Sequence, residues 1–231
     1  MPGFPPSQHY RESGTGGTGR TEWSLEEADN KGFWSRYAKL YDFEVDRFSH
    51  RAYERMYQLM SESLGSDMDV LEVATGTGLI ALNIAGSVRS VAATDFSPGM
   101  IAKASRKPAP ANVAFSIEDA TSLSFADASF DAVIISNALH IMQNPRLALE
   151  NIRRVLKPNG LLIAPTFSHG HPRQSTWNLN TRLLRHIGFE TYSKWTPEEY
   201  VAFISDNGFR VSRWLMLNAA FPLVYLEARV S

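Results

Sequence analysis

Short apolar stretches alternate with helical patterns through the middle of this 231-residue chain. The stretches of strand length lie at residues 70–74, 90–95, 113–118, 130–136 and 161–167. Strands that alternate with helices form βαβ units, and their right-handed crossovers produce a parallel sheet. The sequence therefore predicts an α/β fold with helices on both faces of a mostly parallel sheet.

The C-terminal region departs from this alternation. Two further strands are expected at 209–217 and 223–230, joined by a short connection. So few residues permit only a hairpin, so the last strand should run antiparallel, and Pro222 suits its start. The expected sheet thus has seven strands, with the last one antiparallel.

Several dipeptides and tetrapeptides predict where helices begin and end. Ser97-Pro98 and Asn144-Pro145 are typical of an N-cap followed by the first helical position. Thr196-Pro197-Glu198-Glu199 is a capping box, and its helix should end at Asn207-Gly208. A further helix is expected near 179–187.

Two segments near the N-terminus, residues 1–20 and 33–64, differ in composition. Residues 1–20 consist largely of Gly, Pro, Ser and Thr, so we expect a disordered tail there. Residues 33–64 are aromatic-rich with helical spacing, and Gly65 ends the run. The remaining residues, 21–231, are expected to form a single domain whose N-terminal helical segment spans 33–65.

Composition excludes several classes of protein. The chain has no cysteine, which rules out disulfide scaffolds, thiolate metal sites and thiol catalysis. With 23 Lys+Arg against 24 Asp+Glu, no bulk charge attracts nucleic acid or an anionic membrane. No apolar stretch approaches the ~20 residues of a membrane span, and the first twenty residues lack a signal-peptide core. We expect a cytoplasmic protein without a nucleic-acid partner; nothing indicates its oligomeric state.

A glycine-containing loop follows the first strand. In Glu72-Val73-Ala74-Thr75-Gly76-Thr77-Gly78, glycines allow a sharp turn, and the following helix N-terminus offers free N–H groups. The spacing of Gly76, Gly78 and Ala81 also satisfies the dinucleotide pattern, with Asp95 about twenty residues on. A tight turn without a ligand is the third interpretation, although open α/β sheets bind ligands at this edge.

Two acids and the hairpin argue against a nicotinamide site. Glu72 lies within the first strand, and Asp119, followed by Ala120, comes directly after the third. Both acids should therefore lie at the edge that carries the glycine loop. A nicotinamide domain usually continues with parallel strands, whereas this sheet is expected to close with an antiparallel hairpin.

Five segments in order resemble the successive motifs of class I S-adenosylmethionine-dependent methyltransferases. They are residues 70–78, 91–100, 117–125, 130–142 and 154–163. The likeness covers roughly 33–231 and is greatest between 69 and 165. Within the family the chain most resembles the branch with ubiquinone/menaquinone C-methyltransferases and phosphatidylethanolamine N-methyltransferases. The resemblance implies a Rossmann-like methyltransferase domain, S-adenosylmethionine as cofactor, S-adenosylhomocysteine as product, and a small-molecule or lipid-like acceptor.

The resemblance also implies roles for individual residues. The residues implied in cofactor binding are Glu72, Ala74, Thr75, Gly76 and Gly78 at the methionyl end, Asp95 at the ribose, Phe96, Met100, Asp119 and Ala120 at the adenine, and Asn137 and Leu139 beside the sulfonium. The aromatic run that ends at Tyr41-Asp42 resembles the family's N-terminal lid, which adds Tyr41. The family usually has glycine in place of Ala74, whose methyl group narrows the approach to the methionine part.

Simpler interpretations of the same residues stay open. Asp95 is also suited to cap the helix at Ser97, and Asp119 to stabilise a turn. Phe96 and Met100 have the residue types of ordinary core positions.

The chemistry implied by the resemblance needs few catalytic groups. The sulfonium already activates the methyl group, so an in-line displacement depends mainly on positioning. His140, after the fourth strand, is the candidate base or acceptor-lining residue. His169 and His171 follow the fifth strand, but no third ligand is near in sequence, so an acceptor loop is expected rather than a metal site.

Two rival functions remain at this level. One is a nicotinamide-dependent oxidoreductase, and the other is a degenerate methyltransferase fold that only binds ligands, for which Ala74 is the support. Base methylation of nucleic acid is disfavoured because residues 137–140 replace the Asn-Pro-Pro-aromatic tetrad it uses. The sequence leaves open the acceptor and whether O, N or C is methylated.

Overall fold

The computed structural model describes residues 25–168, 191–217 and 222–231. In helix α1 (Leu25–Ser63), it describes the side chains of residues 32–38, 42 and 50–63. The expected tail at 1–20 and the expected helix near 179–187 lie outside these ranges, as do His169 and His171. The side chain of Tyr41 is likewise outside the described set.

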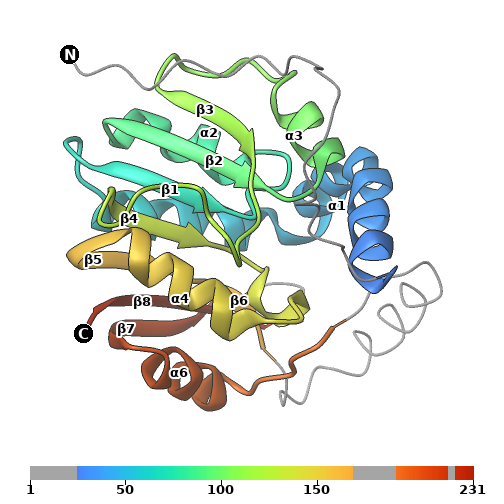
Figure 1. Ribbon diagram of the computed structural model, residues 1–231. Helices are drawn as coiled ribbons and strands as arrows, with labels where there is room; N and C mark the ends of the chain where they lie inside the picture. Colours follow the sequence, from blue (N-terminus) through green and yellow to red (C-terminus); the bar gives the residue numbers. More distant parts are fainter. Residues whose placement is uncertain (1–24, 169–190, 218–221) are drawn as a thin grey trace, which may run out of the picture.

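One mixed eight-stranded sheet forms the centre of the molecule (Figure 1). Its parallel strands are β1 (Asp69–Val73), β2 (Ser90–Asp95), β3 (Val113–Ile117), β4 (Phe130–Ile135) and β5 (Leu156–Ile163). Strand β8 (Leu223–Val230) is antiparallel to β5, β6 (Thr166–Phe167) and β7 (Phe209–Leu217). The order is β3-β2-β1-β4-β5-β8-β6, with β7 paired to β8. The α/β class and the antiparallel last strand are confirmed.

The eighth strand arises because the expected strand at 161–167 is interrupted. Ile163 pairs with Glu227 and Thr166 pairs with Val224, so β6 continues β5 in the same register along β8. Between them, the Ala164 N–H donates to the Leu226 carbonyl, whereas the Pro165 carbonyl accepts from the Asn137 N–H after β4. The prediction of seven strands was wrong in count because the segment is divided at residues 164–165, although both parts keep one register along β8.

Strand β5 also begins earlier than expected. Leu156 pairs with Phe130, whereas the next pair is Leu161 with Ala132, so the register shifts between them. The expected turn at 158–160 is this irregularity, and Asn159 takes a left-handed φ of 59° within it. The turn residues therefore interrupt the strand rather than precede it.

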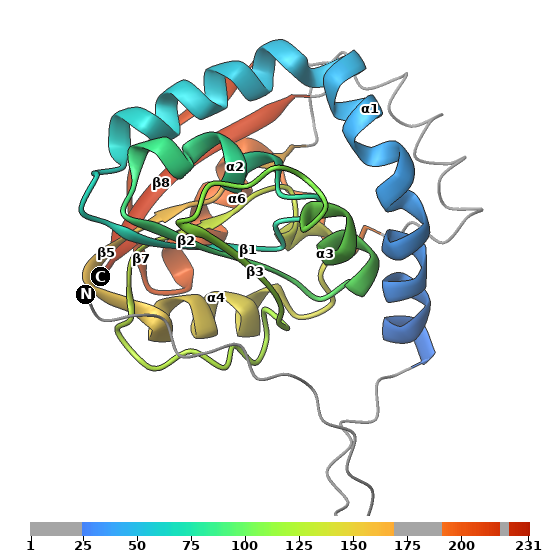
Figure 2. The same ribbon diagram turned by 90° about the horizontal axis from the view of Figure 1, so that it is seen from above.

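Helices cover both faces of the sheet, as expected (Figure 2). Apart from α1, they are α2 (Leu79–Ile84), α3 (Pro98–Ala104), α4 (Pro145–Val155) and α6 (Pro197–Asp206), with short 3₁₀ turns η1 (Ala85–Ser87) and η2 (Leu139–Ile141). Helix α1 begins eight residues before the expected start at 33. Figure 2 shows that it bends, so that its first part runs beside α3 and its second part lies over the sheet.

Two buried clusters sandwich the sheet. Met56, Leu59 and Met60 of α1 pack with α2 and with Val70 of β1 on one face. On the other face, α4 and α6 pack with a cluster that includes Leu71 and Val73 of β1, which we call the α4-side cluster. Successive strand side chains point to opposite faces, so Glu72 points to the α1 side.

Two of the three predicted helix starts have the expected side-chain capping bonds. The Ser97 hydroxyl accepts from the Met100 N–H, and both bonds of the Thr196–Glu199 capping box are present. Pro145 occupies the first turn of α4, but the Asn144 side chain makes no capping bond to the residues described.

Candidate functional site

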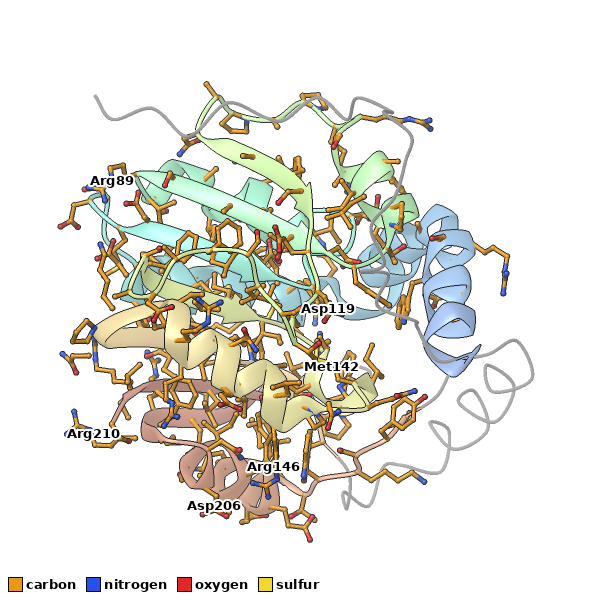
Figure 3. All side chains as sticks on the ribbon, in the orientation of Figure 1. Arg89, Asp119, Met142, Arg146, Asp206 and Arg210 are labelled. Carbon is orange, nitrogen blue, oxygen red and sulfur yellow. The ribbon has the colours of Figure 1, made fainter. Side chains whose placement is uncertain are left out.

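The sequence-predicted residues gather where the parallel strands end. Strand pairing aligns Val73 with Thr94 and with Ile135, and Asp95 with Ile117. The segments after β1, β2, β3 and β4 therefore meet at one edge. Figure 3 labels Asp119, just after β3, at this edge, and Arg89, just before β2, at the opposite one. We call the edge where the strands end the carboxyl edge.

The loop after β1 is a compact turn built on left-handed residues. Ala74, Gly76 and Gly78 have φ values of 55°, 58° and 80°. The Thr75 N–H donates to the Thr94 carbonyl at 2.8 Å, and the Gly78 N–H donates to the Thr75 carbonyl at 3.0 Å. These bonds fix the loop against β2 and close the turn at the start of α2.

Gly78 is required by close packing as well as by its φ. A Cβ there would lie 2.8 Å from the Phe115 ring and 3.4 Å from Ala104. Its free side is thus filled by β3 and α3, and its N–H is used within the turn. The resemblance gave Gly78 a place at the methionyl end, whereas the contacts seen here are those of a packing glycine.

Ala74 is strained where the family usually has glycine. A left-handed conformation costs a residue with a Cβ roughly 1–2 kcal/mol. The Ala74 side chain is partly buried and packs against the α4-side cluster. The departure noted in the sequence is therefore a conformational strain in addition to an extra methyl group.

Glu72 is a carboxyl group held in the interior. It is 1% exposed, and its Oε2 accepts from the Thr75 hydroxyl at 2.6 Å. Burial raises its pKa to about 8, although the bonds from Thr75 and from the Ala81 N–H act in the other direction; the charge of Asp95 adds to the rise. Near neutral pH this group therefore holds a proton.

Asp95 joins two loops at the carboxyl edge. It is 6% exposed; its Oδ2 accepts from the Gly76 N–H at 2.8 Å and its Oδ1 from the Ser97 N–H at 2.9 Å. Burial raises its pKa to about 6 despite these two bonds. Because a carboxylate has about four acceptor positions, each oxygen keeps capacity for a further donor.

The adenine-end residues are placed less uniformly. Asp119 Oδ1 accepts from the N–H and the hydroxyl of Thr121, both at 2.7 Å, which is the turn-stabilising interpretation. Met100 and Ala120 are buried, whereas Phe96 is partly exposed. Leu139 is buried in the α4-side cluster, so the structure places it in the core.

Asn137 and its neighbour Ser136 carry unsatisfied oxygen atoms. Asn137 has a left-handed φ of 52°; its N–H donates to the Pro165 carbonyl and its Nδ2 to the Tyr53 hydroxyl at 3.3 Å. Within the described part of the chain, Asn137 Oδ1 and Ser136 Oγ are buried without a hydrogen-bond partner. A buried unpaired polar group typically costs about 1–3 kcal/mol, so it calls for a ligand or water.

His140 is buried and hydrogen-bonded. It is 3% exposed, its Nδ1 lies 3.0 Å from the Thr166 hydroxyl, and its ring meets Phe167 edge to face. Its carbonyl accepts from the N–H groups of Tyr192 and Ser193. His140 thus links η2 to β6 and to the segment before α6.

A cleft of about 590 Å³ opens between α1 and α2. Its walls include Asp42, Tyr53, Tyr57 and Leu79. Tyr53 also reaches Asn137, so the cleft adjoins the polar groups after β4. Sequence reasoning missed Tyr53 because its partner Asn137 is distant in the chain. It missed Ser136 because burial of the Ser136 hydroxyl depends on the folded packing.

The described residues offer neither a metal cluster nor a membrane-spanning helix. Among them, no group of three or more His, Asp or Glu side chains is arranged to hold a metal ion. Within the same ranges, no helix combines the length and the apolar character needed to traverse a bilayer.

Comparison with known proteins agrees with this geometry. Residues 71–164 match the family described as "Methyltransferase domain". The matched segment runs from β1 to the end of β5. Of the two enzyme classes that the glycine loop left open, this match favours the methyltransferase over the nicotinamide-dependent oxidoreductase.

Curated relatives match over part of their length. The demethylmenaquinone methyltransferase of Renibacterium salmoninarum is 40% identical over 134 residues, which cover 57% of this chain and 56% of that protein. The enzyme of the same name from Paenarthrobacter aurescens is 41% identical over 135 residues, covering 57% and 52%. The chain thus spans about half the length of these relatives.

Solved structures share the Rossmann-like fold of the methyltransferase domain. The putative methyltransferase in a complex with the Haloferax volcanii Trm112 activator has a TM-score of 0.74 at 19% identity, covering 87% of this chain and 96% of that one. The 1,6-didemethyltoxoflavin-N1-methyltransferase of Burkholderia thailandensis, with S-adenosylhomocysteine bound, has a TM-score of 0.69 at 16% identity over 88% of both chains.

Proposed function

We propose that this chain transfers a methyl group from S-adenosylmethionine to a small-molecule acceptor. The methyltransferase domain supports the reaction class. The observation that carries the proposal is the pair of buried carboxyl groups at the carboxyl edge, Glu72 and Asp95, whose pKa values burial raises to about 8 and about 6. Such groups are stabilised by a ligand that brings positive charge and hydrogen-bond donors.

The donor and acceptor set at this edge fits the cofactor. Asp95 has one remaining acceptor position on each oxygen, which suits the two hydroxyls of a ribose. Glu72, together with the loop at 74–76, suits the cationic amino group of the methionyl end. The unpaired Asn137 Oδ1 and Ser136 Oγ offer further acceptors after β4.

The other roles follow the same arrangement. Phe96 and Met100 would flank the adenine, and Ala120 would adjoin it. Asp119 would receive the adenine amino group on the oxygen that Thr121 does not use. Tyr41 completes the proposed set at the lid.

When bound, the cofactor supplies a methyl group already activated by its sulfonium. The chain's own residues then bind, orient and exclude water, which is where the rate acceleration of a positioned displacement originates. Thr166 holds the His140 ring through Nδ1. We place His140 at the acceptor side, as a lining residue or as the base for an acceptor that must lose a proton.

A quinone-type molecule is the acceptor class we propose. The relatives from Renibacterium salmoninarum and Paenarthrobacter aurescens are named demethylmenaquinone methyltransferases. Tyr53 and Tyr57 line the α1–α2 cleft beside the polar groups after β4, which suits an aromatic acceptor with oxygen substituents. We propose a cytoplasmic enzyme with no nucleic-acid substrate.

The test separates binding from chemistry. Calorimetric titration with S-adenosylmethionine and with NAD should give saturable binding of the first only; the reverse result overturns the proposal. Purified chain, S-adenosylmethionine and a reduced naphthoquinone that lacks the ring methyl group should then yield S-adenosylhomocysteine. The same quinone already methylated on the ring is the matched control. Cofactor binding without turnover on a broad acceptor panel would favour a pure binding module.

A further inference from the structure

The first part of α1 is docked against α3 at the carboxyl edge (Figure 2). The Ser35 and Ser97 hydroxyls are hydrogen-bonded at 2.9 Å, and Lys103 Nζ donates to the Ala38 carbonyl. The helices approach so closely that a Cβ on Gly99 would lie 2.7 Å from Ser35. This packing places the next turn of α1 above the glycine loop.

One carboxylate of that turn connects three elements. Asp42 accepts a hydrogen bond from the Thr77 hydroxyl and forms ion pairs with Lys103 at 3.0 Å and Lys107 at 3.1 Å. Burial alone would raise the pKa of Asp42, but the bonds from Thr77 and the two lysines lower it on balance. Asp42 is therefore an anion at neutral pH, bound to the loop on one side and to α3 on the other.

Thr77 is a buried residue of the loop whose hydroxyl is hydrogen-bonded to α1. It is fully buried, and it lies between Gly76 and Gly78, both in left-handed conformations. Glycines restrict the backbone least, so the loop's geometry depends on the bonds its other residues make. The bond to Asp42 is the contact that joins Thr77 to α1, 35 residues earlier in the chain.

We propose that Asp42 is a positioning residue, which holds Thr77 and thereby the loop at 74–78 in its ligand-binding geometry. This inference rests on the proposed cofactor site. It makes cofactor affinity depend on the docking of α1. Because coupling between two binding events is reciprocal, a bound cofactor must equally stabilise the docked position of α1.

Four variants of the full chain test the coupling. Asp42→Asn removes the charge, Thr77→Val removes the hydroxyl at constant shape, and Thr77→Ser restores a hydroxyl. Glu62→Gln is the matched control, since Glu62 is an exposed acid of the same helix that faces Arg55 and Arg213. The probe is S-adenosylhomocysteine, and its Kd is measured by calorimetry on variants whose circular dichroism matches the wild type.

We expect Asp42→Asn and Thr77→Val each to weaken binding by roughly tenfold, because each removes a charge-assisted hydrogen bond. The double variant should be about as weak as Asp42→Asn alone, since the hydroxyl and the carboxylate share one bond and only Asp42→Asn also weakens the ion pairs with the two lysines. Thr77→Ser and Glu62→Gln should stay within about threefold of the wild type. In hydrogen exchange, the probe should protect amides 33–42 in the wild type and not in Asp42→Asn.

Failure of this inference is distinguishable from failure of the proposed function. A wild-type chain that does not bind S-adenosylhomocysteine overturns both. A wild type that binds, with Asp42→Asn and Thr77→Val that bind equally well, overturns only the role of Asp42. Thr77→Val leaves the sequence of α1 and the ion pairs of Asp42 unaltered, so it decides the question even if Asp42→Asn unfolds. Additive effects in the double variant also contradict the proposal, because independent effects require two separate interactions.

Discussion

Carboxyl groups at the two edges of the sheet have pKa values shifted in opposite directions. Where the strands begin, Asp69 accepts from Arg89 Nε at 2.8 Å, and Asp131 accepts from Lys157 at 2.7 Å. The bond from Arg89 lowers the pKa of Asp69 to about 2. At the carboxyl edge, three residues further along β1, burial raises the pKa of Glu72 to about 8.

Under the proposed function, β1 serves stability at one end and ligand binding at the other. At the edge where the strands begin, which we call the starting edge, Asp69 and Asp131 are partly exposed and form ion pairs with Arg89 and Lys157. Glu72 and Asp95 are buried, and their described partners are a hydroxyl and backbone N–H groups. Burial disfavours the charged form of both groups in the free protein, and a ligand of opposite charge would offset this effect.

The largest effect we expect is on cofactor affinity at the carboxyl edge. Asp95→Asn should weaken S-adenosylhomocysteine binding on the order of 100-fold, because an amide offers one acceptor atom and turns an N–H₂ toward a backbone donor. Asp131→Asn is the matched control from the other edge and should leave the Kd unchanged. Calorimetry measures both; equal losses in the two variants would erase the distinction between the edges.

Glu72 should make the free protein less stable as the pH rises. Its folded pKa of about 8 lies above the ordinary 4.5, so its contribution is fully present below about pH 4.5 and is lost as the pH rises through 8. Glu72→Gln mimics the protonated group. Above pH 8 it should exceed the wild type in free energy of unfolding by on the order of a few kcal/mol. Urea unfolding at pH 5, 7 and 9 measures this, and parallel pH profiles would disprove it.

Ala74→Gly should relieve the strained turn. Removing the Cβ recovers part of the roughly 1–2 kcal/mol of left-handed strain, offset by the greater backbone entropy of unfolded glycine, so the net gain is about 1 kcal/mol or less. S-adenosylhomocysteine should bind more tightly as well. Ala128, with a φ of 51°, is strained in the same way outside the site. Ala128→Gly should therefore stabilise the fold without changing the Kd, and a loss of affinity in Ala74→Gly would count against the strain argument.

The smallest effect belongs to the starting edge. Asp131→Asn removes the ion pair with Lys157 and weakens the bond from the Asp69 N–H, yet partly exposed pairs contribute less than about 1 kcal/mol. Burial opposes ionisation of Asp131, but Lys157 and the Asp69 N–H lower its pKa on balance. Its contribution is thus present near neutral pH and lost as the pH falls below the ordinary range of Asp. Thermal unfolding of the variant and wild type should converge at low pH.

Periodicity and helix signals were sufficient for most of the fold. They located β1 to β4, the C-terminal hairpin and the capping box at Thr196 because each depends on neighbouring residues. The division of the strand at Pro165 and the early start of β5 depend on which partners the strands find. The early start of α1 does have a local sequence signal, because Ser24-Leu25-Glu26-Glu27 fits a capping box.

The site was predictable to the extent that strand order determines it. Glu72, Asp95 and Asp119 follow or end successive strands, so the parallel topology alone brings them to one edge. The Thr77–Asp42 and Asn137–Tyr53 contacts join residues 35 and 84 positions apart, and no local pattern encodes them. Burial of Leu139 in the core likewise depends on the packing of α4 and α6.

The central claim is that the buried acids of the carboxyl edge receive the cationic cofactor. Titrating the wild-type chain with S-adenosylhomocysteine at pH 6.5, in two buffers of different ionisation enthalpy, tests it most directly. Glu72 is protonated at that pH, and a positive ligand group beside it favours its ionisation. Binding should therefore release protons, and Glu72→Gln should release fewer. Absence of binding, or binding with net proton uptake, would contradict the account.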